Sequence, residues 1–181
     1  MSKHYMSTVS GRLWNKHKLM SQIFDPNDVP YIIPLEGDRY EIHFPPLLKK
    51  ILNEQAAQLK NELSSETDLH PNLMRLNPPA SLNDIQRAID FNSLHNFSIR
   101  NTHLTNLQIL IDTENEANVT EDAVASIAQA INSIRLFLGT ELGIDQGDTD
   151  NILLNQSGSY HLYLLLGYLL DEIVTVISGQ N

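Results

Sequence analysis

The chain of 181 residues contains no cysteine. This absence excludes disulfide bonds, thiolate catalysis, iron–sulfur clusters and cysteine-ligated zinc. It also fits a reducing compartment, so we expect a cytoplasmic protein. The length predicts one ordinary domain with one hydrophobic core rather than two stable domains.

Positive charge is scarce and unevenly placed, and the formal net charge is −10. Residues 1–20 hold four basic and no acidic residues, whereas residues 101–181 hold eleven acidic residues and one basic residue, Arg135. Because binding to nucleic-acid phosphates depends on lysine and arginine, we expect no nucleic-acid partner.

Residues 1–29 are predicted to form a basic, partly ordered tail before a single domain over residues 30–181, because chain ends are loose unless tied down. The tail lacks the apolar region of a secretory signal. Its charges are too sparse for a polybasic patch, although a nucleic-acid or membrane arm stays an alternative. The apolar residues of the tail leave room for a short docked segment; they are Leu13, Trp14, Met20, Ile23 and Phe24.

A β-hairpin is predicted over residues 31–44, with its turn at residues 36–38. Residues 39–44 alternate between apolar and polar side chains, which is typical of a half-buried strand. Pro34 cannot donate a backbone hydrogen bond, so the first strand should be short or at a sheet edge.

Apolar residues at helical spacing predict a mainly α protein, in which a compact helical bundle surrounds an apolar C-terminal helix and carries the small N-terminal hairpin. Thr120 is expected to cap a helix and Gly143 to end it. A break is expected at the polar stretch 92–96. The predicted helices cover residues 46–63, 82–93, 99–111, 121–142 and 160–177.

The helix over residues 160–177 is apolar on nearly every side, so we expect it to be enclosed by the other helices. A membrane-spanning alternative is disfavoured, because the uninterrupted apolar stretch 162–170 has nine residues and a bilayer needs about 20. Asp171 and Glu172 follow that stretch directly.

Motifs for catalysis or cofactor binding are missing. There is no glycine-rich phosphate loop, nucleophile elbow or paired-histidine zinc helix. Asp145, Asp148 and Asp150 lie in a glycine-containing loop, but their spacing departs from the EF-hand pattern. We therefore expect no catalytic residues, no cofactor and no metal.

Arg135 is the principal candidate residue, because it lies within an apolar helical run. A buried arginine needs an anionic partner, and Asp171 or Glu172 would supply one as an inter-helix ion pair. An arginine exposed in a groove for a carboxylate or phosphate ligand is the alternative, and a plain surface position is the third. Gly139, Gly143 and Gly147 recur every four residues, which predicts close packing and helix termination. The candidate structural or binding residues are Arg135, Gly139, Thr140, Glu141, Asp171 and Glu172.

The segment 131–144, followed by the tyrosine-started helix 160–177, resembles the uncharacterised actinobacterial family DUF2017. The likeness covers residues 31–177. It implies a cytoplasmic, mainly helical protein that is often encoded beside the Clp protease adaptor ClpS. Glu141 stands where the family often has a basic residue, and Tyr163 and Tyr168 stand in a helix where it often has tryptophan. No established catalytic residues are available to carry over.

These observations favour a non-catalytic protein-interaction or accessory factor, which the resemblance would link to Clp-type proteolysis. An acidic helical surface suits such a factor, because net charge affects solubility and partner steering rather than chemistry. A homo-oligomeric or structural role is also open, because any leucine-rich face left exposed after folding would need a partner. The alternative is a small-molecule-binding protein or unrecognised enzyme with a pocket near Arg135, Glu141, Asp171 and Glu172.

Overall fold

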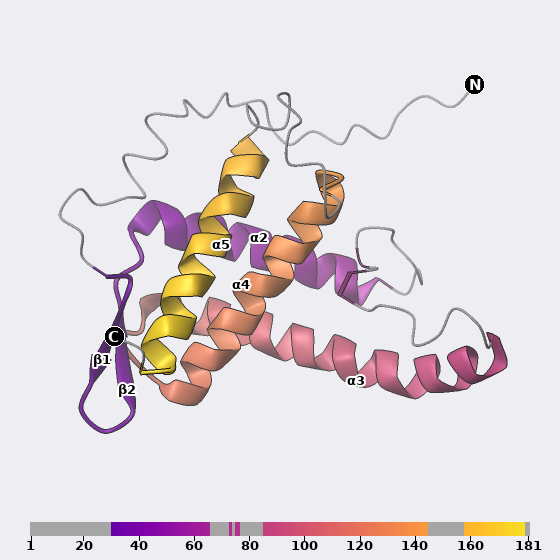
Figure 1. Cartoon of the computed structure of the whole chain (residues 1–181), viewed down its shortest axis with the longest axis horizontal. Coiled ribbons are helices and arrows are strands. Elements are labelled where there is room, and N and C mark those ends of the chain that lie inside the picture. Colours follow the sequence, from indigo (N-terminus) through magenta and orange to yellow (C-terminus); the bar gives the residue numbers. More distant parts are fainter. Residues whose placement is uncertain (1–29, 66–72, 74, 77–84, 145–157, 180–181) are drawn as a thin grey trace.

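The structure, a computed structural model, describes residues 30–65, 73, 75–76, 85–144 and 158–179. The predicted tail, the aspartate-containing loop and the third glycine of the repeat, Gly147, lie outside the described residues. Figure 1 shows the arrangement of the elements, with α3 extending away from the other helices.

A three-stranded antiparallel sheet stands at the N-terminal end of the domain, in the order β1 (Ile32–Leu35), β2 (Arg39–Ile42) and β3 (Asn118–Thr120). The predicted turn is present, with Gly37 and Asp38 at positive φ. β1 is four residues long and lies at the edge, as the proline it contains predicted. β3 was not predicted; its Val119 pairs with Tyr40 and is buried.

Four α-helices and one short 3₁₀ helix make up most of the described chain, which confirms the mainly helical fold class. One prediction was wrong: residues 92–96 do not break the helix, and α3 runs through them without interruption. That stretch contains neither glycine nor proline, and other residues cost a helix only a few tenths of a kcal/mol each. The elements are α2 (Pro46–Ser64), α3 (Ile85–Asp112), η2 (Thr113–Asn115), α4 (Glu121–Glu141) and α5 (Gly158–Ile177).

α4 is the most buried helix and packs against α2, α3 and α5. Its ends form as predicted. The Thr120 hydroxyl accepts a hydrogen bond from the Ala123 N–H at 3.3 Å. Gly143 has φ +64°, and the N–H groups of Gly143 and Ile144 donate to the carbonyls of Thr140 and Gly139. This bond pair is the Schellman arrangement that closes a helix.

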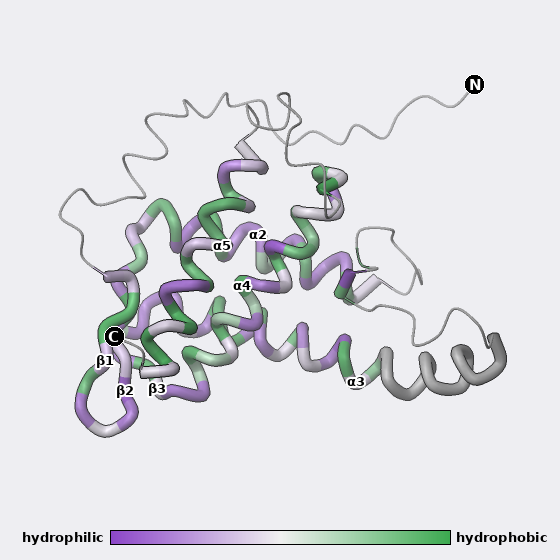
Figure 2. The backbone as a smooth tube through the Cα atoms, viewed as in Figure 1, coloured by the Kyte–Doolittle hydropathy of each residue, from purple (hydrophilic) through white to green (hydrophobic). Residues whose placement is uncertain are grey.

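α5 lies at the surface and is not enclosed on all sides, which corrects the sequence-based expectation. One side is buried in the core through Leu165, Leu166, Leu169 and Ile173. On the other side Leu164, Tyr168 and Val174 are 50%, 55% and 59% exposed. Figure 2 shows how hydrophobic and hydrophilic segments alternate along the packed helices. With so few helices in the bundle, a helix in the outer layer buries only one face.

Among the described helices, α5 alone is long and apolar enough to cross a membrane by length and composition. A single helix of this kind is weak evidence, since core helices and signal sequences meet the same criteria. The length of the nine-residue apolar stretch therefore does not decide whether α5 could cross a membrane. The packing of α5 bears more directly on this point than its composition does. The helix contributes four buried side chains to the core and contacts β1.

Candidate functional site

Arg135 projects from α4 onto Tyr163 of α5. Its Nη2 donates to the Tyr163 hydroxyl at 3.1 Å, and its guanidinium carbon lies 4.4 Å from the centre of the tyrosine ring. This is cation–π geometry. The Nε atom of Arg135 is buried and has no hydrogen-bond partner. Arg135 is thus held by an aromatic ring and left with one unsatisfied donor.

Two glycines make this contact between the helices possible. A Cβ atom at Gly167 would lie 3.2 Å from Arg135 Nε, and a Cβ atom at Gly139 would lie 3.1 Å from the Tyr163 ring. Each helix therefore provides a glycine where the other helix places a large side chain. The close packing predicted for Gly139 is present. The matching role of Gly167 was missed, although a glycine within a leucine-rich helix is an available signal.

The two carboxylates expected to pair with Arg135 have other positions. Glu172 accepts hydrogen bonds from the backbone N–H groups of Tyr31 and Ile32, the latter at 3.4 Å. Asp171 is exposed, and its backbone carbonyl accepts from the Thr175 hydroxyl at 2.8 Å. The structure records no ion pair between Arg135 and either of these described residues. Glu172 instead joins α5 to the first strand.

The remaining candidates do not join Arg135. The Thr140 hydroxyl donates to the Leu136 carbonyl of its own helix at 3.0 Å. Glu141 is exposed on the last turn of α4. Arg75, which was not a candidate, reaches this region: its Nη1 would be 3.2 Å from a Cβ at Gly139, and its Nη2 donates to the Ile144 carbonyl. The junction therefore consists of Arg135, Tyr163, Gly139, Gly167 and Arg75.

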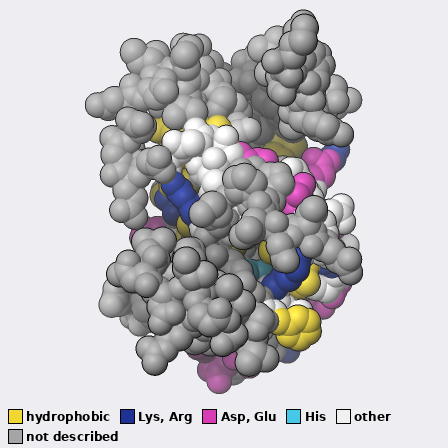
Figure 3. All heavy atoms as spheres, turned by 90° about the vertical axis from the view of Figure 1, so that its right-hand side faces the viewer, with side chains coloured by type: hydrophobic (Ala, Val, Ile, Leu, Met, Phe, Trp, Pro, Cys, Tyr) yellow, Lys and Arg dark blue, Asp and Glu magenta, His cyan; other side chains and the backbone are white. Residues whose placement is uncertain are grey.

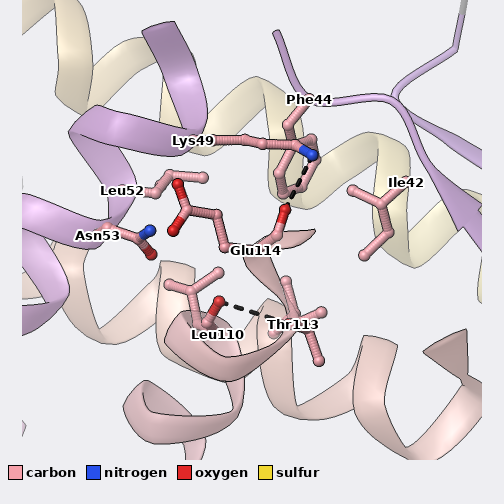
Figure 4. Close-up of a pocket in the computed structure, with 9 residues that line it drawn as sticks. Ile42, Phe44, Lys49, Leu52, Asn53, Leu110, Thr113 and Glu114 are labelled. Carbon is pink, nitrogen blue, oxygen red and sulfur yellow. Dashed lines mark hydrogen bonds between the residues drawn. The ribbon is translucent and has the colours of Figure 1, made fainter. Parts of the chain in front are cut away.

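A small cavity lies between α2, η2 and β2, as Figure 4 shows. There the Lys49 ammonium donates to the Glu114 carbonyl at 2.9 Å. The cavity volume is about 20 Å³, which is room for about one water molecule. It is too small for a metabolite. It is lined by Ile42, Phe44, Lys49, Leu52, Asn53, Leu110, Thr113, Glu114 and Ile127.

A wider, open hollow of about 390 Å³ follows one side of α3. Its described lining comes entirely from that helix and includes Phe97, which is 68% exposed. Figure 3 views the molecule from the side toward which α3 extends, and its described part carries hydrophobic, acidic and basic side chains near one another. Neither this hollow nor the small cavity is lined by Arg135.

His103 forms a polar contact between α3, α4 and the turn before α3. Its Nδ1 lies 2.9 Å from the Ser133 hydroxyl, and its Nε2 lies 3.2 Å from the Leu76 carbonyl. Desolvation lowers the pKa of His103, and the hydrogen bond to the Leu76 carbonyl opposes that shift. The Leu76 carbonyl can only accept, so in the neutral ring Nε2–H donates to it and Nδ1 carries no proton. The single hydroxyl proton of Ser133 is then shared between Nδ1 and the Gln129 carbonyl, which lies 2.8 Å from the same hydroxyl oxygen. Ser133 is buried, so this pair is not a nucleophile–base site open to substrate.

In the described part of the chain, no three histidine, aspartate or glutamate side chains gather closely enough to hold a metal ion. The described residues define a mainly helical protein in which three of the exposed large apolar side chains lie on one side of α5. The chain belongs to DUF2017, a family described as a domain of unknown function, whose model matches residues 34–177. That match runs from β1 to the last residue of α5. No curated protein and no solved structure shows a significant match.

Proposed function

We propose that the protein is a non-catalytic interaction factor that binds a protein partner through the outer face of α5, defined as Leu164, Tyr168, Asp171 and Val174. The carrying observation is the exposure of its three apolar side chains. Successive members are three or four residues apart, so they are neighbours on the helix surface. Single exposed apolar residues are ordinary, whereas a group rimmed by polar residues is typical of an interaction site.

The chemistry of this face indicates which surface would bind it. Asp171 is exposed within the apolar group, and α5 contains no lysine or arginine. The whole chain carries a formal net charge of −10. A partner with apolar residues flanked by lysine or arginine would bury the leucine and valine and oppose the aspartate. Such charge complementarity mainly increases association rate and specificity.

The family resemblance supplies a candidate partner for this surface. The resemblance implies a gene neighbourhood that often includes the Clp protease adaptor ClpS, so we propose a partner within Clp-type proteolysis in an actinobacterial cytoplasm. An accessory or regulatory role there requires recognition rather than bond-making chemistry. Self-association through the same face is less favoured, because two copies would bring together surfaces with the same excess of negative charge.

The test is capture of partners on immobilised full-length protein, with and without added Clp adaptor. Leu164→Asp changes an exposed residue and should abolish capture of the specific partner while leaving the fold intact. The matched control is Phe97→Asp, which changes an exposed apolar residue on α3 and should capture normally. Identical capture by wild-type, Leu164→Asp and Phe97→Asp proteins would overturn the assignment of the surface.

A small-molecule site beside Arg135 is the second candidate. The buried Nε atom of Arg135 lacks an acceptor, which a carboxylate or phosphate ligand would supply. Its geometry is unfavourable, because the guanidinium is stacked on Tyr163 and lies next to Gly167. Titration of wild-type and Arg135→Met proteins with inorganic phosphate and with acetate tests this alternative, since only an arginine-dependent thermal stabilisation supports it.

A further inference from the structure

We propose that, in the free protein, the outer face of α5 is covered by the chain's own N-terminal segment, residues 13–24. This inference deepens the proposed function, because it assigns an internal occupant to the surface that the partner would use. A protein partner would then have to displace the segment before binding.

The first support is where the chain enters the described structure. The backbone N–H groups of Tyr31 and Ile32 donate to the Glu172 carboxylate of α5. β1 also packs against α5. Residue 30 therefore lies beside the C-terminal half of α5, next to the exposed face rather than across the molecule from it.

The second support is reach. Leu164 and Val174 are ten positions apart on a helix, which corresponds to about 15 Å along its axis at 1.5 Å per residue. Phe24 is six positions before Pro30, and six residue steps span up to about 20 Å when extended, at 3.3–3.6 Å per residue. The apolar part of the segment can therefore reach every position of the face without a long connecting loop.

The third support is chemical complementarity. The segment carries apolar side chains together with Lys16 and Lys18, in a region of four basic and no acidic residues. The face offers exposed apolar side chains around Asp171, in a region with eleven acidic residues and one arginine. A second copy would present the same acidic face, so the chain's own basic segment is the better occupant. The apolar side chains available are Leu13, Trp14, Met20, Ile23 and Phe24.

Trp14 makes the proposal directly measurable, because it is the only tryptophan in the chain. In the full-length protein we expect blue-shifted emission and at least twofold weaker acrylamide quenching than in the same protein unfolded in urea. Leu164→Asp and Val174→Asp should each shift the emission to longer wavelength and raise the quenching constant toward the unfolded value. Phe97→Asp should leave both readings unchanged, and circular dichroism should show that all three variants stay folded.

A second set of variants leaves the described fold untouched. Lys16→Glu with Lys18→Glu should raise Trp14 quenching at low salt, and so should added salt in the wild-type protein. Trp14 that is already fully quenchable in the folded wild-type protein, or that does not respond to the α5 substitutions, would overturn the inference. Because these measurements need no partner, they separate the two proposals: partner capture lost in Leu164→Asp with a freely accessible Trp14 would sustain the proposed function alone.

Discussion

Arg135 of α4 lies against Gly167 of α5, where a Cβ atom would come within 3.2 Å of the arginine Nε. The arginine is also held by Tyr163, one turn earlier on α5. Neither side chain can withdraw without losing the stack or the hydrogen bond. At this contact, α4 and α5 therefore meet through the Arg135 guanidinium, the Tyr163 ring and the space left by Gly167, and not through an ion pair.

Gly167→Ala should lower the free energy of unfolding by about 1 kcal/mol, because the crowding by Arg135 exceeds the roughly 1 kcal/mol that alanine gains over glycine in a helix. Urea unfolding of the purified variants measures the change. In an Arg135→Ala background the crowding is gone, so the same Gly167→Ala substitution should become stabilising. An unchanged sign in the two backgrounds would show that the glycine does not accommodate the arginine.

Tyr163→Phe should lower the free energy of unfolding by about 1 kcal/mol, since it removes the hydroxyl that accepts from Arg135. Asp171→Asn should have almost no effect, because Asp171 is exposed and does not pair with the arginine. Thermal and urea unfolding of the two variants make the comparison. A larger loss of stability in Asp171→Asn than in Tyr163→Phe would contradict this prediction and would support the inter-helix ion pair predicted from the sequence.

Sequence patterns locate several features of this fold because those features are local. Thr120 and Gly143 act within a few residues of themselves, and their capping bonds depend on side-chain and backbone chemistry that the sequence displays. The alternation of residues 39–44 likewise predicts a strand with Tyr40, Ile42 and Phe44 on one face. Tyr40 and Phe44 are buried and Ile42 is half-buried, although the strand itself ends at Ile42. In each case one turn or one strand contains all the information.

Features that depend on distant residues were not predictable in the same way. β3 has three residues and one apolar side chain, and it exists because Val119 pairs with Tyr40 far away in the chain. The composition of α5 showed that it is apolar but not how many neighbours it has. The partner of Arg135 was sought among carboxylates, whereas Tyr163, four residues before Gly167, was the available alternative.

Glu172→Ala should detach the first strand from α5 and lower the free energy of unfolding by roughly 1–3 kcal/mol, since two backbone N–H groups lose their acceptor. Glu172→Gln retains a carbonyl oxygen and should cost less. Asp171→Ala is the matched control on the neighbouring exposed position. Hydrogen exchange of the Tyr31 amide, measured by NMR, should accelerate in Glu172→Ala; unaltered exchange would mean that the carboxylate does not protect it.

His103 should make stability fall in mildly acidic solution. Burial lowers its pKa in the folded protein below the ordinary 6.5, so the unfolded chain binds a proton more readily than the native protein. Its contribution is present above pH 6.5 and is lost as the pH falls through 6.5 toward the lower folded pKa. His103→Gln cannot be protonated in this range, so the wild-type protein should lose more stability than this variant between pH 7.5 and pH 5. Parallel pH dependences in urea unfolding would contradict this linkage, and His43→Gln, at an exposed position, serves as the control.

The packing of α5 argues against its insertion across a bilayer. Its buried side is part of the core through Leu166, Leu169 and Ile173, and its Glu172 carboxylate holds the first strand. Insertion across a bilayer would expose that core and take Asp171 and Glu172 into hydrocarbon, where a charged carboxylate costs about 2.5 kcal/mol or more at the helix centre. We therefore expect the full-length protein to remain in the supernatant after cell lysis and ultracentrifugation, without detergent. The same should hold for Leu164→Asp, whereas retention of the wild-type protein in alkali-washed membranes, reversed by Leu164→Asp, would identify α5 as a membrane-inserting helix.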